Sequence, residues 1–202
     1  MRRTSYAIAI MAIGLLLSIV LDSLTGGPNW ILPLLAVALL IPFSIAVLRE
    51  HHEWTRLIAI VIAVVVTVGL IASVIFLINA LFTHAAEGQE LFRDAALLWV
   101  INVAVFAVWY WEIDQGGPQL RSHRESRSTD FLFPQMTSDA EQWRGWKPEF
   151  LDYLFLAFNT STAFSPTDTL VMSRRAKLLM MTQASISLVV IAVIAARAVN
   201  IA

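Results

Sequence analysis

Residues 150–175 read FLDYLFLAFNTSTAFSPTDTLVMSRR, and this stretch decides the fold that we expect. Its apolar first half is helical in character but too short to cross a bilayer, which takes about 20 apolar residues. The run breaks at Ser165-Pro166 into hydroxyl side chains and Asp168 before a last hydrophobic segment begins. Backbone that leaves a helix at membrane depth is tolerated only where protein or an aqueous cavity surrounds it. The break therefore predicts a pore or a substrate site.

The composition is that of an integral membrane protein. Of the 202 residues, 58% are hydrophobic and 14% are charged, whereas soluble domains have about 45–50% and about 25%.

The chain starts Met1-Arg2-Arg3 before an apolar run, as a secretory signal does, but no A-x-A cleavage pattern follows, so we expect an uncleaved span. Five apolar runs predict transmembrane helices, namely residues 4–21, 23–48, 57–83, 95–111 and 178–196.

The distribution of cations predicts the orientation of these helices. If the N-terminus is cytoplasmic, most of the Lys and Arg residues lie in inner segments and only Arg93 lies in an outer loop, as the positive-inside rule requires. The cluster at 174–177 stays inside if residues 151–169 enter and leave by the cytoplasmic face. The prediction is an all-α bundle of five transmembrane helices plus a re-entrant, pore-type half-helix in a bacterial inner membrane. In a second arrangement residues 151–165 cross fully, which gives six spans and moves that cluster outside.

Three regions follow from this reading. Residues 1–112 form a four-helix transmembrane region, residues 113–149 a polar cytoplasmic loop, and residues 150–202 the re-entrant helix, turn and final helix. Within the loop we expect residues 121–128 to be a flexible basic segment near the anionic leaflet. The apolar residues Phe131, Leu132 and Phe133 with Pro134, and the rings of Trp143 and Trp146, are expected at the headgroup level or against the bundle.

Small polar side chains around the break are the candidate ion-path residues. Asp168 has three possible roles: it caps the re-entrant turn, pairs with Arg174-Arg175, or draws a cation toward the mouth of a pore. Gln183 and Ser187 lie four positions apart and share a helix face, so they either line a pore or bond a neighbouring helix. The full set is Asn159, Thr160, Ser161, Thr162, Ser165, Thr167, Asp168, Gln183 and Ser187.

Other polar residues in the spans have plainer readings. Asn79 and Asn102 are expected to bond neighbouring helices. Glu112 and Asp114 are the best candidates for a catalytic pair, but they fit better as polar residues that end the fourth span, and no enzyme motif is present. We therefore expect no enzyme activity.

No metal or cofactor is expected either. The chain has no cysteine, which excludes disulfides and thiolate metal sites. The run His51-His52-Glu53 has no second motif with metal-ligand spacing and fits a solvated loop. A net charge of −1 argues against nucleic acid as a partner.

The C-terminal half resembles a bacterial integral membrane family of unknown function, the domain-of-unknown-function family thirteen forty-five. The resemblance implies a membrane fold and no particular activity. It is carried by residues 109–111, 116–117, 130–134, 152–158, 165–169, 174–177 and 199–201.

A wider resemblance implies a mechanism. An aromatic half-helix, a Thr-rich turn, an aspartate and a final helix are similar to the pore of a two-span potassium channel. Ala163 and Ser165 replace both filter glycines, and non-glycine residues disfavour positive φ, so the carbonyl rings of a potassium filter are not expected. The resemblance implies a homo-oligomeric channel or transporter for small ions in the lipid bilayer. The alternative is a non-conducting scaffold or assembly protein.

Overall fold

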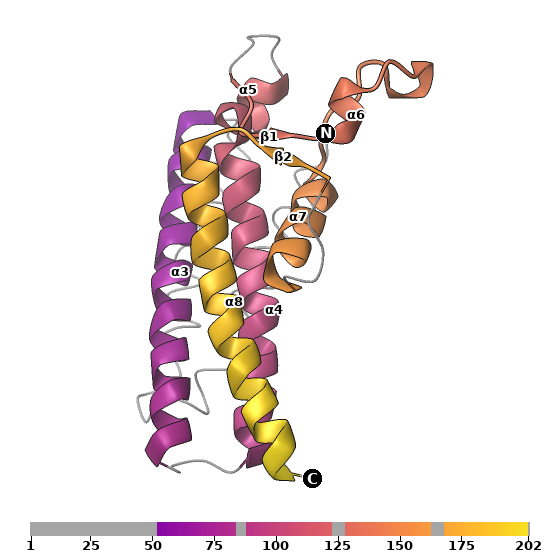
Figure 1. Ribbon diagram of the computed structural model, residues 1–202. Helices are drawn as coiled ribbons and strands as arrows, with labels where there is room; N and C mark the ends of the chain where they lie inside the picture. Colours follow the sequence, from indigo (N-terminus) through magenta and orange to yellow (C-terminus); the bar gives the residue numbers. More distant parts are fainter. Residues whose placement is uncertain (1–51, 84–87, 123–127, 163–167, 202) are drawn as a thin grey trace.

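The computed structural model describes residues 52–83, 88–122, 128–162 and 168–201, which are mostly helical. Three long helices run side by side: α3 (His52–Thr83), α4 (Gly88–Ile113) and α8 (Arg174–Ile201) (Figure 1). All three are long and apolar enough to cross a membrane, over residues 56–83, 88–116 and 174–196. The chain is thus a membrane protein, and three of the expected spans are confirmed as helices of sufficient length. The expected spans 4–21 and 23–48 lie outside the described residues.

Helix α4 occupies the centre of the described bundle. In the most apolar 18-residue stretch of α4, 61% of the residues are buried, whereas the corresponding fractions are 33% in α3 and 28% in α8. It begins earlier than the apolar run at 95–111 indicated, because the mixed polar and apolar residues 88–94 form its first turns. Glu90 in the first turn stabilises this start, since a carboxylate there faces the positive end of the helix dipole.

Helix α7 (Phe150–Thr162) is a short helix of 13 residues that packs against α4 and α8. Strand β1 (Phe131–Leu132) precedes it, and strand β2 (Leu170–Val171) follows it. The two strands pair antiparallel, with Phe131 opposite Val171 and Leu132 opposite Leu170. Because these strands pair, the segments before and after α7 lie at the same end of the bundle, where α7 begins (Figure 1).

The start of α7 is fixed by a local hydrogen bond. The backbone N–H of Glu149 donates to the Asp152 carboxylate at 2.7 Å, which is the bond that the third residue of a helix makes back to its cap in a capping box. The bond stops the helix from extending toward the preceding loop.

The polar loop between α4 and α7 folds into short elements: η1 (Asp114–Gly116), α5 (Pro118–Ser122), β1, α6 (Pro134–Thr137) and η2 (Glu141–Trp143). It turns sharply after α4, because Gln115, Gly116 and Gly117 have φ of 52°, 82° and 100°. Glycine takes this left-handed conformation without strain. At Gly117 a Cβ would also lie 3.3 Å from the Glu112 carbonyl oxygen, so the tight turn requires glycine there.

The expectation of a flexible basic segment is wrong at its first residue. Arg121 is only 9% exposed, because its Nη1 donates at 2.9 Å to the carbonyls of Trp111 and Asp114. The last carbonyls of a helix lack partners within the helix, and the guanidinium supplies donors for them. Residues 123–127 lie outside the described part of the chain.

Phe131, Phe133 and Trp146 of the loop pack against the bundle, as one of the two expectations had it, whereas Trp143 makes no such ring contact among the described residues. Phe131 and Phe133 are buried, and both rings contact the ring of Tyr153 on α7, with centroids 6.3 and 5.4 Å away. Trp146 stacks edge-on against Phe133. These contacts anchor the loop over the start of α7.

Candidate functional site

Helix α7 is held in the bundle by two hydrogen-bonded networks, one deep among the helices and one at the end where the chain enters α7. We call them the deep network and the interfacial network. The deep network consists of Asn102, Tyr110, Ser161, Gln183 and Ser187; the interfacial network consists of Asp114, Arg121, Thr129, Asp130, Tyr153 and Arg175.

Gln183 is the centre of the deep network. Its side chain is fully buried, and its Nε2 donates to the Ala157 carbonyl at 2.8 Å and to Ser161 Oγ at 2.7 Å. Its Oε1 accepts the hydroxyl of Tyr110 at 2.5 Å, and its backbone carbonyl accepts Asn102 Nδ2 at 3.2 Å. One residue of α8 therefore connects α4, α7 and α8.

The position of Tyr110 near the end of α4 explains how it reaches this depth. Helical side chains point toward the N-terminus of their own helix, so the ring of Tyr110 extends from the end of α4 toward the middle of the bundle. Gln183 lies on the antiparallel helix α8, and for the same reason its side chain points toward the end of α4. The two side chains meet between their backbone levels.

Ser187 lies one turn beyond Gln183 and bonds the end of α7. Its hydroxyl donates to the carbonyl of Ser161 at 2.5 Å, and both residues are 1% exposed. The last carbonyls of a helix have no donor within the helix, and in hydrocarbon an unsatisfied carbonyl costs several kcal/mol. Of the two roles expected for Gln183 and Ser187, the structure has the bond to a neighbouring helix.

The two asparagines differ. Asn102 links α4 to α8, which confirms the expectation of an interhelical bond. Asn79 is exposed on α3, and its side chain bonds no other residue of the described segments. That expectation is not met within the described part of the chain.

Among the described residues, the other candidates at the end of α7 make no side-chain bond to α8, but Thr160 lies within hydrogen-bonding reach of the Tyr110 hydroxyl in the deep network. Thr160 Oγ1 donates to the Leu156 carbonyl and Thr162 Oγ1 to the Asn159 carbonyl, at 2.8 and 3.1 Å. Asn159, Thr160 and Thr162 are half-buried. Ser165 and Thr167 lie outside the described residues.

Asp168 is exposed just before β2, and of its three expected roles the pairing with Arg174-Arg175 is not made among the described residues. Arg175 binds Asp130 instead, through Nε to Oδ1 at 2.7 Å and Nη2 to Oδ2 at 2.5 Å. A bidentate guanidinium–carboxylate pair is stronger and more specific than a single contact. Asp130 also lies beside the end of α4, where Arg175 Nη2 donates to the Ile113 carbonyl at 3.1 Å.

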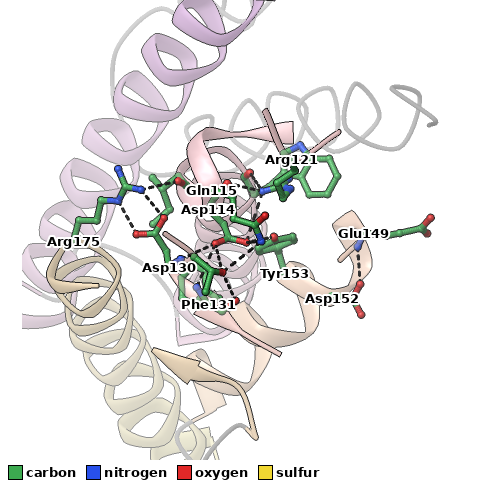
Figure 2. Close-up of polar contacts among 12 residues, drawn as sticks. Asp114, Gln115, Arg121, Asp130, Phe131, Glu149, Asp152, Tyr153 and Arg175 are labelled. Carbon is green, nitrogen blue, oxygen red and sulfur yellow. Dashed lines mark hydrogen bonds and ion pairs between the residues drawn. The ribbon is translucent and has the colours of Figure 1, made fainter. Parts of the chain in front are cut away.

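Asp114 is the centre of the interfacial network (Figure 2). It is fully buried. Its Oδ1 accepts the backbone N–H of Asp130 at 2.8 Å and the hydroxyl of Thr129 at 3.1 Å. Its Oδ2 accepts the hydroxyl of Tyr153 at 2.5 Å. One carboxylate thus ties the end of α4 to β1 and to α7.

Sequence reasoning missed this role, although a signal existed. A carboxylate in the last turn of a helix faces the negative end of the helix dipole, which is unfavourable. Such a residue needs strong donors from elsewhere. Asp114 receives them from the loop and from Tyr153, and Arg121 Nη1 lies 3.9 Å from its Oδ2.

Arginine cations compensate the charge at this end of α4. The guanidinium of Arg121 lies over the rings of Trp111 and Tyr153, 4.4 and 5.0 Å from their centroids, which is a cation–π arrangement.

Burial tends to raise the pKa of Asp130, but hydrogen bonds from Arg175 and Ser173 and the charge of Arg175 outweigh burial, so the pKa lies below its usual value. Asp130 is therefore ionised at neutral pH.

Phe131 packs between the two networks. Its ring centroid lies 5.0 Å from that of Tyr110 in the deep network and 6.3 Å from that of Tyr153 in the interfacial network. Strand β1 thus contributes an apolar contact to each tyrosine.

Among the described residues no group of three His, Cys, Asp or Glu side chains is placed to hold a metal ion.

No family model, curated protein or solved structure matches this chain. The resemblances to the bacterial family thirteen forty-five and to a potassium-channel pore therefore stay predictions.

Proposed function

We propose that this is a five-span protein of a bacterial inner membrane, with a cytoplasmic N-terminus, in which α7 is a re-entrant helix that forms part of a path for small ions. The observation that carries the proposal is the combination of a 13-residue helix with flanking strands that pair at one end of the bundle. A helix of this kind enters a membrane without crossing it.

The depth that α7 reaches supports this proposal. Its residue Ser161 bonds Ser187, which lies 13 positions beyond the first residue of α8, or about 20 Å along the helix at 1.5 Å per residue. The hydrocarbon core is about 30 Å thick. The last turn of α7 therefore ends within the bilayer and not at its far surface.

The end of α7 has the chemistry of a cation path. Its last turn carries Asn159, Thr160, Ser161 and Thr162, and the C-terminus of a helix bears partial negative charge. Hydroxyl and carbonyl oxygens there replace part of the hydration shell of an ion. Asp168, exposed just before β2 at the end of the bundle where α7 starts, draws cations toward the mouth of this path.

The path runs beside the outer side of α7, between copies of the chain in a homo-oligomer. The side of α7 that faces α8 offers no open acceptors, since Gln183 and Ser187 already bond it. Asn159 and Thr162 are half-buried at the edge of that contact. Several copies would bring these edges together around one axis.

A second candidate, a non-conducting scaffold or assembly protein, is favoured by one specific observation. The polar side chains of Ser161, Gln183 and Ser187 bond each other and the backbone, which is the arrangement of groups that hold helices together. In that case α7 only fills the bundle.

Ion flux into proteoliposomes tests the proposal. Purified protein is compared with empty vesicles under sodium, potassium, chloride and proton gradients, beside Asp168→Asn and the matched control Asp139→Asn, whose carboxylate is also exposed but lies in the loop before α7. We expect cation flux that Asp168→Asn lowers severalfold and Asp139→Asn leaves unchanged. Absence of flux under every gradient and voltage would instead favour the scaffold.

A further inference from the structure

Strand β1 and the residues beside it are attached to three helices by bonds of very different exposure. Toward α4 and α7 the attachment is the buried carboxylate of Asp114, which accepts from the backbone of Asp130 and from Tyr153. Toward α8 it is the ion pair between Asp130 and Arg175, in which the Arg175 side chain is 55% exposed and that of Asp130 is buried; the same guanidinium also donates to the Ile113 carbonyl. Two residue pairs join β1 to β2, and beside them the Met172 N–H donates to the Asp130 carbonyl at 2.9 Å.

These attachments differ in strength for physical reasons. Removing a partner from a buried hydrogen bond leaves a desolvated group, and Asp114 has several such buried donors. Water and salt compete for the exposed guanidinium of the Asp130–Arg175 pair, although its bidentate geometry strengthens it. The side of β1 that faces α8 is therefore the side that opens first.

The apolar contacts point the same way. On the side of α4 and α7, Phe131 is fully buried against Tyr110 and Tyr153. On the side of β2, Leu170 is 60% exposed and Val171 is half-buried, and in the first turns of α8 the small Ala176 is buried. Separation of β2 from β1 thus exposes smaller side chains than separation of β1 from α4, which would expose the Phe131 ring.

We propose that β1 and β2 form a latch: β1 stays fixed on α4 and α7, and β2 with the first turns of α8 moves away when the Asp130–Arg175 pair opens. The movement ends at Gln183, where α8 is bonded to α4 and α7 through side chain and backbone. The part of α8 that moves is therefore the segment from Arg174 to Gln183.

The consequence for transport rests on the proposed function. Opening of the latch moves β2, and with it Asp168, away from the start of α7 at the mouth of the path. An open latch then admits ions to the outer side of α7, and a closed latch blocks them. The latch itself is a structural claim that is testable without transport.

The chain has no cysteine, so a single cysteine pair reports on the latch without background. Leu132→Cys with Leu170→Cys places the pair at partnered positions of β1 and β2. Spin labels on this pair measure the distance between the strands by double electron–electron resonance in nanodiscs. We expect a short main distance, and a second, longer distance that grows at least twofold in population with Asp130→Asn.

Two further variants keep the test independent of folding defects. Arg175→Lys retains the charge but loses the bidentate bond, and it should raise the longer population less than Asp130→Asn does. Asp139→Asn is the matched control and should leave the distribution unchanged. A single short distance in all four proteins would overturn the latch.

Flux measurements on the same cysteine pair separate the two proposals. We expect that oxidation to a disulfide lowers flux at least tenfold and that reduction restores it, while the single variant Leu132→Cys does not respond to oxidant. Equal flux in the oxidised and reduced states overturns the latch and leaves the transport proposal standing. No flux in either state contradicts transport, and the spin-label distances then decide the latch alone.

Discussion

The two networks that hold α7 solve the same problem with different chemistry. The deep network consists of amide and hydroxyl side chains and contains no charge, whereas the interfacial network has two carboxylates and two guanidinium groups. A charged side chain in the middle of a bilayer is expensive, and the cost falls where the group reaches the interface. The uncharged network thus has the chemistry suited to the middle of a bilayer, and the charged network has the chemistry suited to its interface.

The interfacial network should be the more sensitive of the two to the loss of one residue. Asp114→Ala removes the acceptor of three buried donors, from Asp130, Phe131 and Tyr153, and of the half-buried Thr129 hydroxyl, so we expect a loss of about 3 kcal/mol or more. The measurement is the free energy of unfolding in mixed micelles. Asp139→Ala, at an exposed loop position, is the control, and a loss of similar size in both variants would refute the central role of Asp114.

In the deep network Gln183→Leu should have the largest effect. It leaves the hydroxyls of Tyr110 and Ser161 without this partner, and interhelical hydrogen bonds in membranes contribute about 0.6–2 kcal/mol each. We expect a loss of about 2 kcal/mol, below that for Asp114→Ala, in the same unfolding assay. A larger loss than for Asp114→Ala would reverse the ranking of the two networks.

Ser187→Ala tests a single bond of the deep network. The hydroxyl that caps the Ser161 carbonyl is lost, so we expect a loss of about 1 kcal/mol. Ser185→Ala removes a hydroxyl from an exposed position on the same helix and should change the free energy of unfolding by less than about 0.5 kcal/mol. Indistinguishable values for the two serines would show that the bond to α7 adds no stability.

Acid should weaken the interfacial network and leave the deep network unchanged. The pKa of Asp130 is lowered in the folded protein, so its contribution to stability is present at neutral pH and is lost as pH falls below about 4 and through the lowered pKa. The melting temperature of the wild type should therefore approach that of Asp130→Asn as pH is lowered from 7 to 3. A difference in melting temperature that stays constant over this range would mean that the ionised Asp130 carboxylate gains no stability from Arg175.

The transmembrane helices could be predicted because their length follows from the thickness of the bilayer. Runs 57–83, 95–111 and 178–196 coincide with α3, α4 and α8 within several residues. The shared face of Gln183 and Ser187 followed from helical spacing. What these two side chains contact could not be predicted, because two polar residues on one helix face fit a water-filled pore as well as a bond to a neighbouring helix.

The interfacial network could not be predicted from periodicity. Asp114 and Tyr153 lie 39 positions apart, and Asp130 and Arg175 lie 45 positions apart. They meet only because the loop folds back over α4, and no repeat marks that fold. The prediction for Arg121 was wrong for the same reason. Its charged sequence neighbours indicated a solvent-exposed segment, whereas its guanidinium is buried against the end of α4.

The central claim is that α7 enters and leaves the membrane by the same face, and labelling of single cysteines tests it most directly. Asp139→Cys and Asp168→Cys place exposed thiols before and after α7, and Gln89→Cys places one at the start of α4, at the opposite end of the bundle. In sealed inside-out vesicles we expect a membrane-impermeant maleimide to label the first two and not the third. Labelling of Asp139→Cys and Asp168→Cys from opposite sides would contradict a re-entrant α7 and establish a sixth span.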